Sequence, residues 1–210
     1  MKNLSRDIEI EGINGGRYIT IVSGLPRSGT SMMMRMLEAG GMDILTDHIR
    51  VANYDNPLGY YEFEKVRKLK NGETEWLQEA NGKAVKVISA LLEYLPENYH
   101  YRIIFMRRNI NEILASQKKM LINRGEPVNS IDDVEMAQIF QKHLNQVNNW
   151  LIQHHNIKVE NINYNELLQN PSSNLIKVNK FLDKYLDIES MLAIPDPNLY
   201  RQRENRPGTT

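Results

Sequence analysis

The chain has 210 residues, 41% of them hydrophobic and 25% charged, and its formal net charge at pH 7 is zero. This length suits one α/β domain with a single core, and the balanced charge lacks the basic footprint that duplex nucleic acid or an anionic membrane requires. The chain has no cysteine, no apolar run near the roughly 18 residues of a membrane span, and no signal peptide in its N-terminal MKNLSRDIEIEGINGG, so we expect a cytoplasmic protein without disulfides.

Four short runs rich in β-branched or aromatic residues predict buried strands, at residues 18–22, 84–88, 101–106 and 157–160. Apolar residues at helical spacing predict helices between and after these strands, over 28–39, 109–123, about 132–154 and from 171 onward. Strands that alternate with helices of this length predict a parallel sheet with helices on both faces.

Two helix starts carry their own signals. Ser130 and Asp133 have the spacing of a capping box before the helix at about 132. Pro171 begins the final predicted helix, because proline is favoured at the first helical position. The apolar stripe of that helix is expected at Leu175, Val178, Leu182 and Tyr185.

The domain is predicted to span residues 18–194, after a leader at 1–17 and before an extended basic tail at 195–210. Residues 41–82 are rich in Asn, Gly, Tyr and charge, and we expect them to form a partly helical excursion that covers the sheet and shapes the acceptor pocket. In the tail, Arg201 and Arg203 would either fold back on a phosphate or remain solvated.

The stretch GLPRSGTS, residues 24–31, has the spacing of a phosphate-binding loop between the first strand and the first helix. In such a unit the glycines let backbone N–H groups and the positive end of the helix dipole point at an anion. The hydroxyls of Ser28, Thr30 and Ser31 would add donors. Thr30 occupies the position where a nucleotide triphosphatase carries its lysine, and Arg27 lies in the middle of the loop.

The residues PRSGT resemble the phosphosulfate loop of the sulfotransferase superfamily, and LPRSGTS is most similar to the loops of tyrosylprotein and small bacterial sulfotransferases. A second motif is similar too: in RRNINEILAS, Arg108 and Ser116 have the spacing of the pair that binds the 3′-phosphate of the donor in this family. The segment INYNELLQNP resembles a structural segment of the family, with Tyr164 beneath the site. The resemblance implies a P-loop-type three-layer αβα sandwich with a parallel sheet of about four to five strands.

The sequence departs from the family where cytosolic members carry Lys-Thr-His at the end of a strand. Lys86 aligns with that lysine, whereas Ile88 replaces the histidine base. Lys86 would either face the site or project to a polar surface. By analogy with tyrosylprotein sulfotransferases, the base would come from the segment DNPLGYYEFE, with Glu62 as the first candidate, Glu64 as the second, and His48 and Asp47 behind them. The alternative for Glu62 is that it caps a helix or forms an ion pair.

The resemblance implies a metal-independent, in-line sulfuryl transfer from 3′-phosphoadenosine 5′-phosphosulfate (PAPS) to a hydroxyl or amine, with adenosine 3′,5′-bisphosphate as product. Donor binding would fall to Arg27, Ser28, Gly29, Thr30, Ser31, Arg108 and Ser116, and catalysis to Arg27, Glu62 and Lys86. The acceptor, a small molecule or a peptide, is not specified by the sequence. Two alternatives remain open: a nucleotide kinase or triphosphatase with a degenerate loop, and a non-catalytic nucleotide-binding protein of the same fold.

Overall fold

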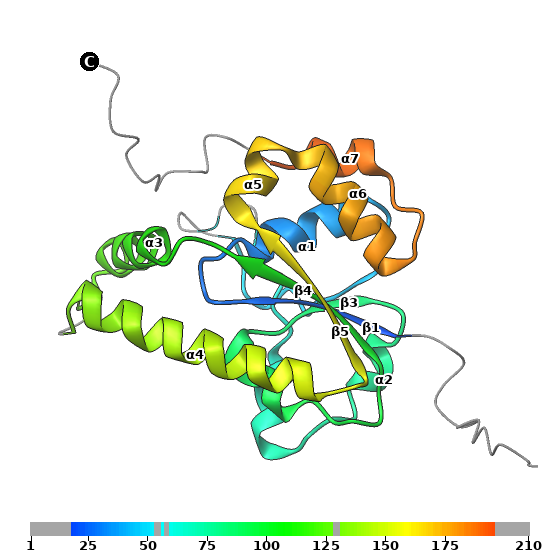
Figure 1. Ribbon diagram of the computed structural model, residues 1–210, viewed down its shortest axis with the longest axis horizontal. Coiled ribbons are helices and arrows are strands. Elements are labelled where there is room, and N and C mark those ends of the chain that lie inside the picture. Colours follow the sequence, from blue (N-terminus) through cyan, green and yellow to red (C-terminus); the bar gives the residue numbers. More distant parts are fainter. Residues whose placement is uncertain (1–17, 53–55, 57–58, 128–130, 196–210) are drawn as a thin grey trace, which may run out of the picture.

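A computed structural model describes residues 18–52, 56, 59–127 and 131–195. These residues form one five-stranded sheet in the order β2-β3-β1-β4-β5, in which all pairings are parallel (Figure 1). The strands are β1 (Ile19–Gly24), β2 (Ile44–Leu45), β3 (Ala84–Lys86), β4 (Tyr101–Arg107) and β5 (Ile157–Asn163). The strand order reverses at β1, so the carboxyl ends of β1, β3 and β4 border the crevice where such sheets bind ligands.

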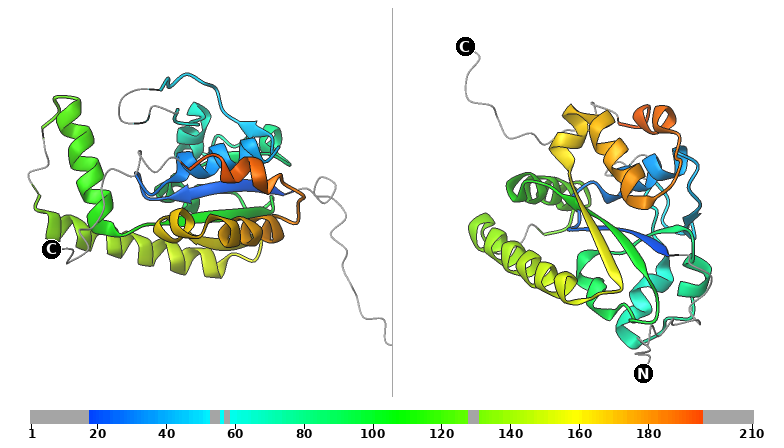
Figure 2. Two further views of the ribbon diagram at one scale, coloured as in Figure 1. Left: turned by 90° about the horizontal axis from the view of Figure 1, so that it is seen from above. Right: turned by 45° about the vertical axis from the view of Figure 1, so that its right-hand side comes forward.

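Helices cover both faces of the sheet, because alternate residues of each strand point to opposite sides. On β4, Ile103 and Phe105 pack in one buried cluster, and Ile104 and Met106 pack in the other. The first cluster is closed by η2 (Glu64–Asn71), α2 (Leu77–Ala80), η3 (Ser89–Tyr94) and α4 (Asp133–Gln153). The second is closed by α1 (Thr30–Ala39), α5 (Tyr164–Gln169), α6 (Pro171–Leu182) and α7 (Ile188–Leu192) (Figure 2). The predicted three-layer α/β architecture is therefore confirmed.

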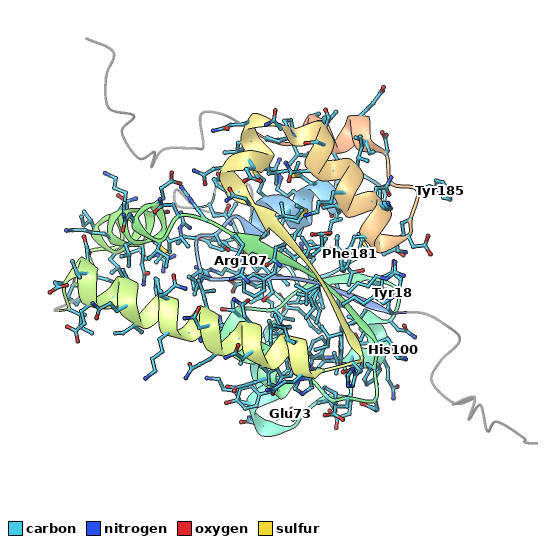
Figure 3. All side chains as sticks on the ribbon, in the orientation of Figure 1. Tyr18, Glu73, His100, Arg107, Phe181 and Tyr185 are labelled. Carbon is cyan, nitrogen blue, oxygen red and sulfur yellow. The ribbon has the colours of Figure 1, made fainter. Side chains whose placement is uncertain are left out.

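Some element boundaries differ from the prediction. Strand β3 ends at Lys86, and Ile88 is 45% exposed. The prediction that Tyr185 continues the stripe of α6 was wrong: the helix ends at Leu182, because Asp183 takes a left-handed φ of 50°. Tyr185 is fully exposed and projects from the molecule (Figure 3), and α7 follows as a further helix.

Two helix caps explain where the long helices begin. The side chain of Asn109 accepts a hydrogen bond from the N–H of Asn111 at the start of α3 (Ile110–Asn123). Asp132 accepts one from the N–H of Glu135 at the start of α4, whereas Ser130 lies outside the described residues. The leader 1–17 and the tail arginines Arg201 and Arg203 also lie outside them. No helix within the described part of the chain is long and apolar enough to cross a membrane.

Candidate functional site

The loop between β1 and α1 takes a conformation suited to binding an anion. Gly24, Arg27 and Gly29 have positive φ angles of 150°, 71° and 99°. At Gly29 an added Cβ would overlap the ring of Tyr164, so this position requires glycine. The first hydrogen bond of α1 runs from the N–H of Met33 to the carbonyl oxygen of Gly29, which leaves the preceding N–H groups of the first turn without acceptors inside the helix. These N–H groups and the helix dipole make the start of α1 suited to binding an anion.

One cavity of about 900 Å³ lies at this end of the sheet. Eight of the predicted site residues line it: Arg27, Gly29, Thr30, Ser31, Glu62, Lys86, Arg108 and Ser116. Ser28 does not line it: the residue is buried, and its N–H donates to the carbonyl oxygen of Leu25 at 3.2 Å within the loop. The cavity wall also holds further basic residues, Arg35, Arg50, Arg67, Lys119 and Arg124, against the acids Asp47, Glu62 and Glu64. A chain of zero net charge thus concentrates positive charge around one cavity, which favours an anionic ligand.

Arg108 and Ser116 are joined through Arg27. The Arg27 Nε donates to Ser116 Oγ at 3.0 Å, and the Arg108 Nη1 donates to the carbonyl oxygen of Arg27 at 3.0 Å. The loop that carries Arg27 is therefore bonded to both members of the second motif. Arg107, by contrast, donates to Asn161 Oδ1 at 2.8 Å and to Asn148, as expected for a side chain directed away from the cavity.

Lys86 faces the site, which answers the question that the sequence left open. Its Nζ lies 3.3 Å from Ser31 Oγ and also donates to the carbonyl oxygen of Tyr60. The residue is 8% exposed, and burial lowers the pKa of Lys86 to about 8, although the nearby Glu62 carboxylate opposes this shift. Lys86 therefore places a cation beside the first turn of α1, close to the position that Thr30 occupies in place of a loop lysine.

Glu62 lies beside Lys86, within an ion-pair cluster. Its carboxylate is 3.8 Å from Lys86 Nζ, 2.6 Å from Arg50 Nη1 and 3.6 Å from Arg67 Nη2. The guanidinium of Arg50 in turn stacks on the ring of Tyr60 at 3.6 Å from its centre. Glu62 thus forms the ion pairs that the alternative interpretation expected, and it also lines the cavity that a base would have to reach.

Two residues that support this site, Glu112 and Asn165, were not predicted from the sequence. Glu112 accepts from Arg108 Nε at 2.9 Å and from Asn165 Nδ2 at 2.9 Å. The four-residue spacing of Arg108 and Glu112 at the start of a helix was a signal for this ion pair.

Among the described residues, no group of three or more His, Asp or Glu side chains is arranged to hold a metal ion.

Comparison with known proteins gives one family. The family model described as "Sulfotransferase domain" matches residues 19–196. A solved sulfotransferase domain, from the Synechococcus PCC 7002 olefin synthase, has a TM-score of 0.50 at 15% identity, over 88% of this chain and 82% of that one. At this level of sequence identity, the similarity shows a shared fold and no more.

Two further solved structures are similar with lower TM-scores. The sulfotransferase domain from the curacin biosynthetic pathway has a TM-score of 0.45 at 18% identity, over 90% of this chain and 78% of that one. Mouse sulfotransferase SULT7A1 complexed with PAP has a TM-score of 0.49 at 19% identity, over 84% of this chain and 62% of the mouse chain. No curated protein sequence matches the chain.

Proposed function

The chain belongs to the sulfotransferase family, and from this premise we propose that it transfers a sulfuryl group from PAPS to a hydroxyl or amine of a small-molecule or peptide acceptor. The observation that carries the proposal is the meeting of two anion-binding motifs on one cavity. The loop at the start of α1 suits the 5′-phosphate, while Arg108 and Ser116 suit the 3′-phosphate. Two phosphates on one nucleoside are what distinguish PAPS and its product from a nucleoside 5′-phosphate.

The proposed reaction is an in-line transfer that needs no metal. The acceptor oxygen or nitrogen forms a bond to sulfur, while the bond from sulfur to the bridging oxygen of the 5′-phosphate breaks and its electron pair stays on the bisphosphate. Arg27 and Lys86 would neutralise the charge that develops on this leaving group, a role that preorganised cations perform in water-excluded sites. Glu62 would take the proton of the acceptor.

The proposal is tested by separating 3′-phosphate recognition from general nucleotide binding. Arg108→Ala is expected to lower the affinity for adenosine 3′,5′-bisphosphate about tenfold or more, because a charge-assisted hydrogen bond is lost. The affinity for adenosine 5′-phosphosulfate should change little. Arg107→Ala is the matched control, because Arg107 is the neighbouring arginine whose side chain bonds Asn148 and Asn161 instead. Equal losses for both ligands in Arg108→Ala, measured by calorimetry, would contradict the assignment of Arg108 to the 3′-phosphate.

A further inference from the structure

The ion pair between Arg108 and Glu112 is buried where an apolar pair would be the simpler choice. The side chain of Arg108 is 7% exposed and that of Glu112 is 4% exposed. Burial of two charges carries a desolvation cost that their attraction often only balances, so apolar residues of similar volume commonly stabilise a fold as well. Stability alone is therefore a poor explanation for a carboxylate at position 112.

The geometry of the pair restricts the guanidinium of Arg108 from several sides. Its Nε donates to Glu112, its Nη1 donates to the carbonyl oxygen of Arg27, and its Cζ lies 4.6 Å from the centre of the Tyr164 ring. Glu112 is itself held, because its second carboxylate oxygen accepts from Asn165 Nδ2. An arginine binds phosphate in a directional manner, so the orientation of its plane decides how well it binds.

The sheet brings these residues together. Strands β4 and β5 are parallel neighbours in which Arg107 lies opposite Asn163, so α3 and α5 begin side by side at the same edge (Figure 1). Tyr164, at the start of α5, also packs against Gly29 of the loop. The start of α5 therefore contacts both predicted phosphate sites.

We infer that Glu112 is a positioning residue which, held by Asn165, orients the guanidinium of Arg108 at the cavity wall for the 3′-phosphate. This inference rests on the proposed function, because it needs a ligand with a 3′-phosphate. Glu112 itself does not have to touch the ligand. Its effect is on selectivity for the bisphosphate over a ligand that carries the 5′-phosphate alone.

The test uses variants that keep the charge and change only the positioning. Glu112→Asp withdraws the carboxylate by one methylene, and Asn165→Ala removes the hydrogen bond that holds Glu112. Affinities for adenosine 3′,5′-bisphosphate and adenosine 5′-monophosphate are measured by calorimetry, and their ratio is the readout. We expect the ratio to fall about tenfold in Glu112→Asp and less in Asn165→Ala. Glu166→Asp, the same change at an exposed position of α5, is the control and keeps the ratio of the parent protein.

Three outcomes have separate meanings. An unchanged ratio in both variants would overturn the inference. Equal losses for both ligands would also overturn it, because they indicate a structural role without effect on selectivity. A parent protein that binds both ligands equally well would contradict the proposed donor instead, and this result is visible before any variant is made.

Discussion

Lys86 is a buried lysine that donates to Ser31 and Tyr60 and lies beside Glu62. Burial lowers its pKa to about 8, and the charge of Arg50 contributes to the shift, while Glu62 opposes it. The ammonium form therefore predominates below pH 8 and is lost as the pH rises further. A lysine with three such acceptors around Nζ is suited to act as a cation, and a base would need the neutral amine.

The lowered pKa of Lys86 predicts the direction in which kcat/KM changes with pH. If Lys86 stabilises the leaving group as a cation, kcat/KM falls above about pH 8 and approaches a tenfold loss per pH unit. Lys86→Arg keeps its charge to much higher pH, so this decline should disappear even if the absolute rate is lower. The measurement is the pH–rate profile of both proteins with one acceptor. A rate that rises through pH 8 and levels off would instead indicate that the neutral amine acts as a base.

The carboxylate of Glu62 is proposed to accept the proton of the acceptor. Glu62→Gln is expected to lower kcat by about 10²–10⁴, the usual contribution of a general base, while donor affinity changes little. Glu64→Gln is the matched control, because this neighbouring carboxylate also lines the cavity and pairs with Arg67. Full turnover in Glu62→Gln would show that Glu62 only pairs with Arg50 and Arg67. The same loss in Glu64→Gln alone would move the base to that residue.

The junction between the loop, α1 and α5 depends on Gly29. Its φ is 99°, and an added Cβ would overlap Tyr164. Gly72 also has a positive φ, 78°, but an added Cβ there meets nothing within 4 Å. Gly72→Ala should therefore lower the free energy of unfolding only through backbone strain, by about 1–2 kcal/mol.

Gly29→Ala should cost the same strain plus the steric overlap with Tyr164, about 1–3 kcal/mol more. The substitution should also weaken the binding of adenosine 3′,5′-bisphosphate, because the first turn of α1 has to shift. Urea denaturation of both variants measures the difference in unfolding free energy. Equal losses of stability in the two variants would show that the loop relaxes away from α5 without cost.

Local signals made most elements predictable. The loop 24–31 and the pair Arg108 and Ser116 were visible because each lies within one strand-to-helix connection, where spacing in sequence sets spacing in the structure. Strand β2 was missed, since two residues, Ile44 and Leu45, are too few to show a period. Tyr185 was misplaced because a helical stripe does not reveal that Asp183 ends the helix.

Contacts between segments far apart in the chain could not be predicted from the sequence. Arg27 bonds Ser116, 89 positions away, and Glu112 bonds Asn165, 53 positions away. Both contacts depend on the strand order, which places β1, β4 and β5 side by side. The spacing of single motifs predicted the members of the candidate site, and the sheet determines which of them touch.

At the scale of the whole molecule, positive charge is local. The chain has a formal net charge of zero, yet basic residues outnumber acids around the cavity at the carboxyl ends of the strands. A net-neutral protein gains little long-range attraction for anions, so the cavity itself has to supply the affinity for a nucleotide. We propose that this affinity is directed at a nucleoside with both a 5′- and a 3′-phosphate.

This specificity is tested by a thermal shift with adenosine 3′,5′-bisphosphate, compared with Mg-ATP at equal concentration. A ligand at about 100 times its Kd adds about 2.7 kcal/mol, which raises the Tm of a domain of this size by roughly 5–10 °C. We expect such a shift with the bisphosphate and little with Mg-ATP. A shift with Mg-ATP alone would contradict it and favour a nucleotide kinase or triphosphatase.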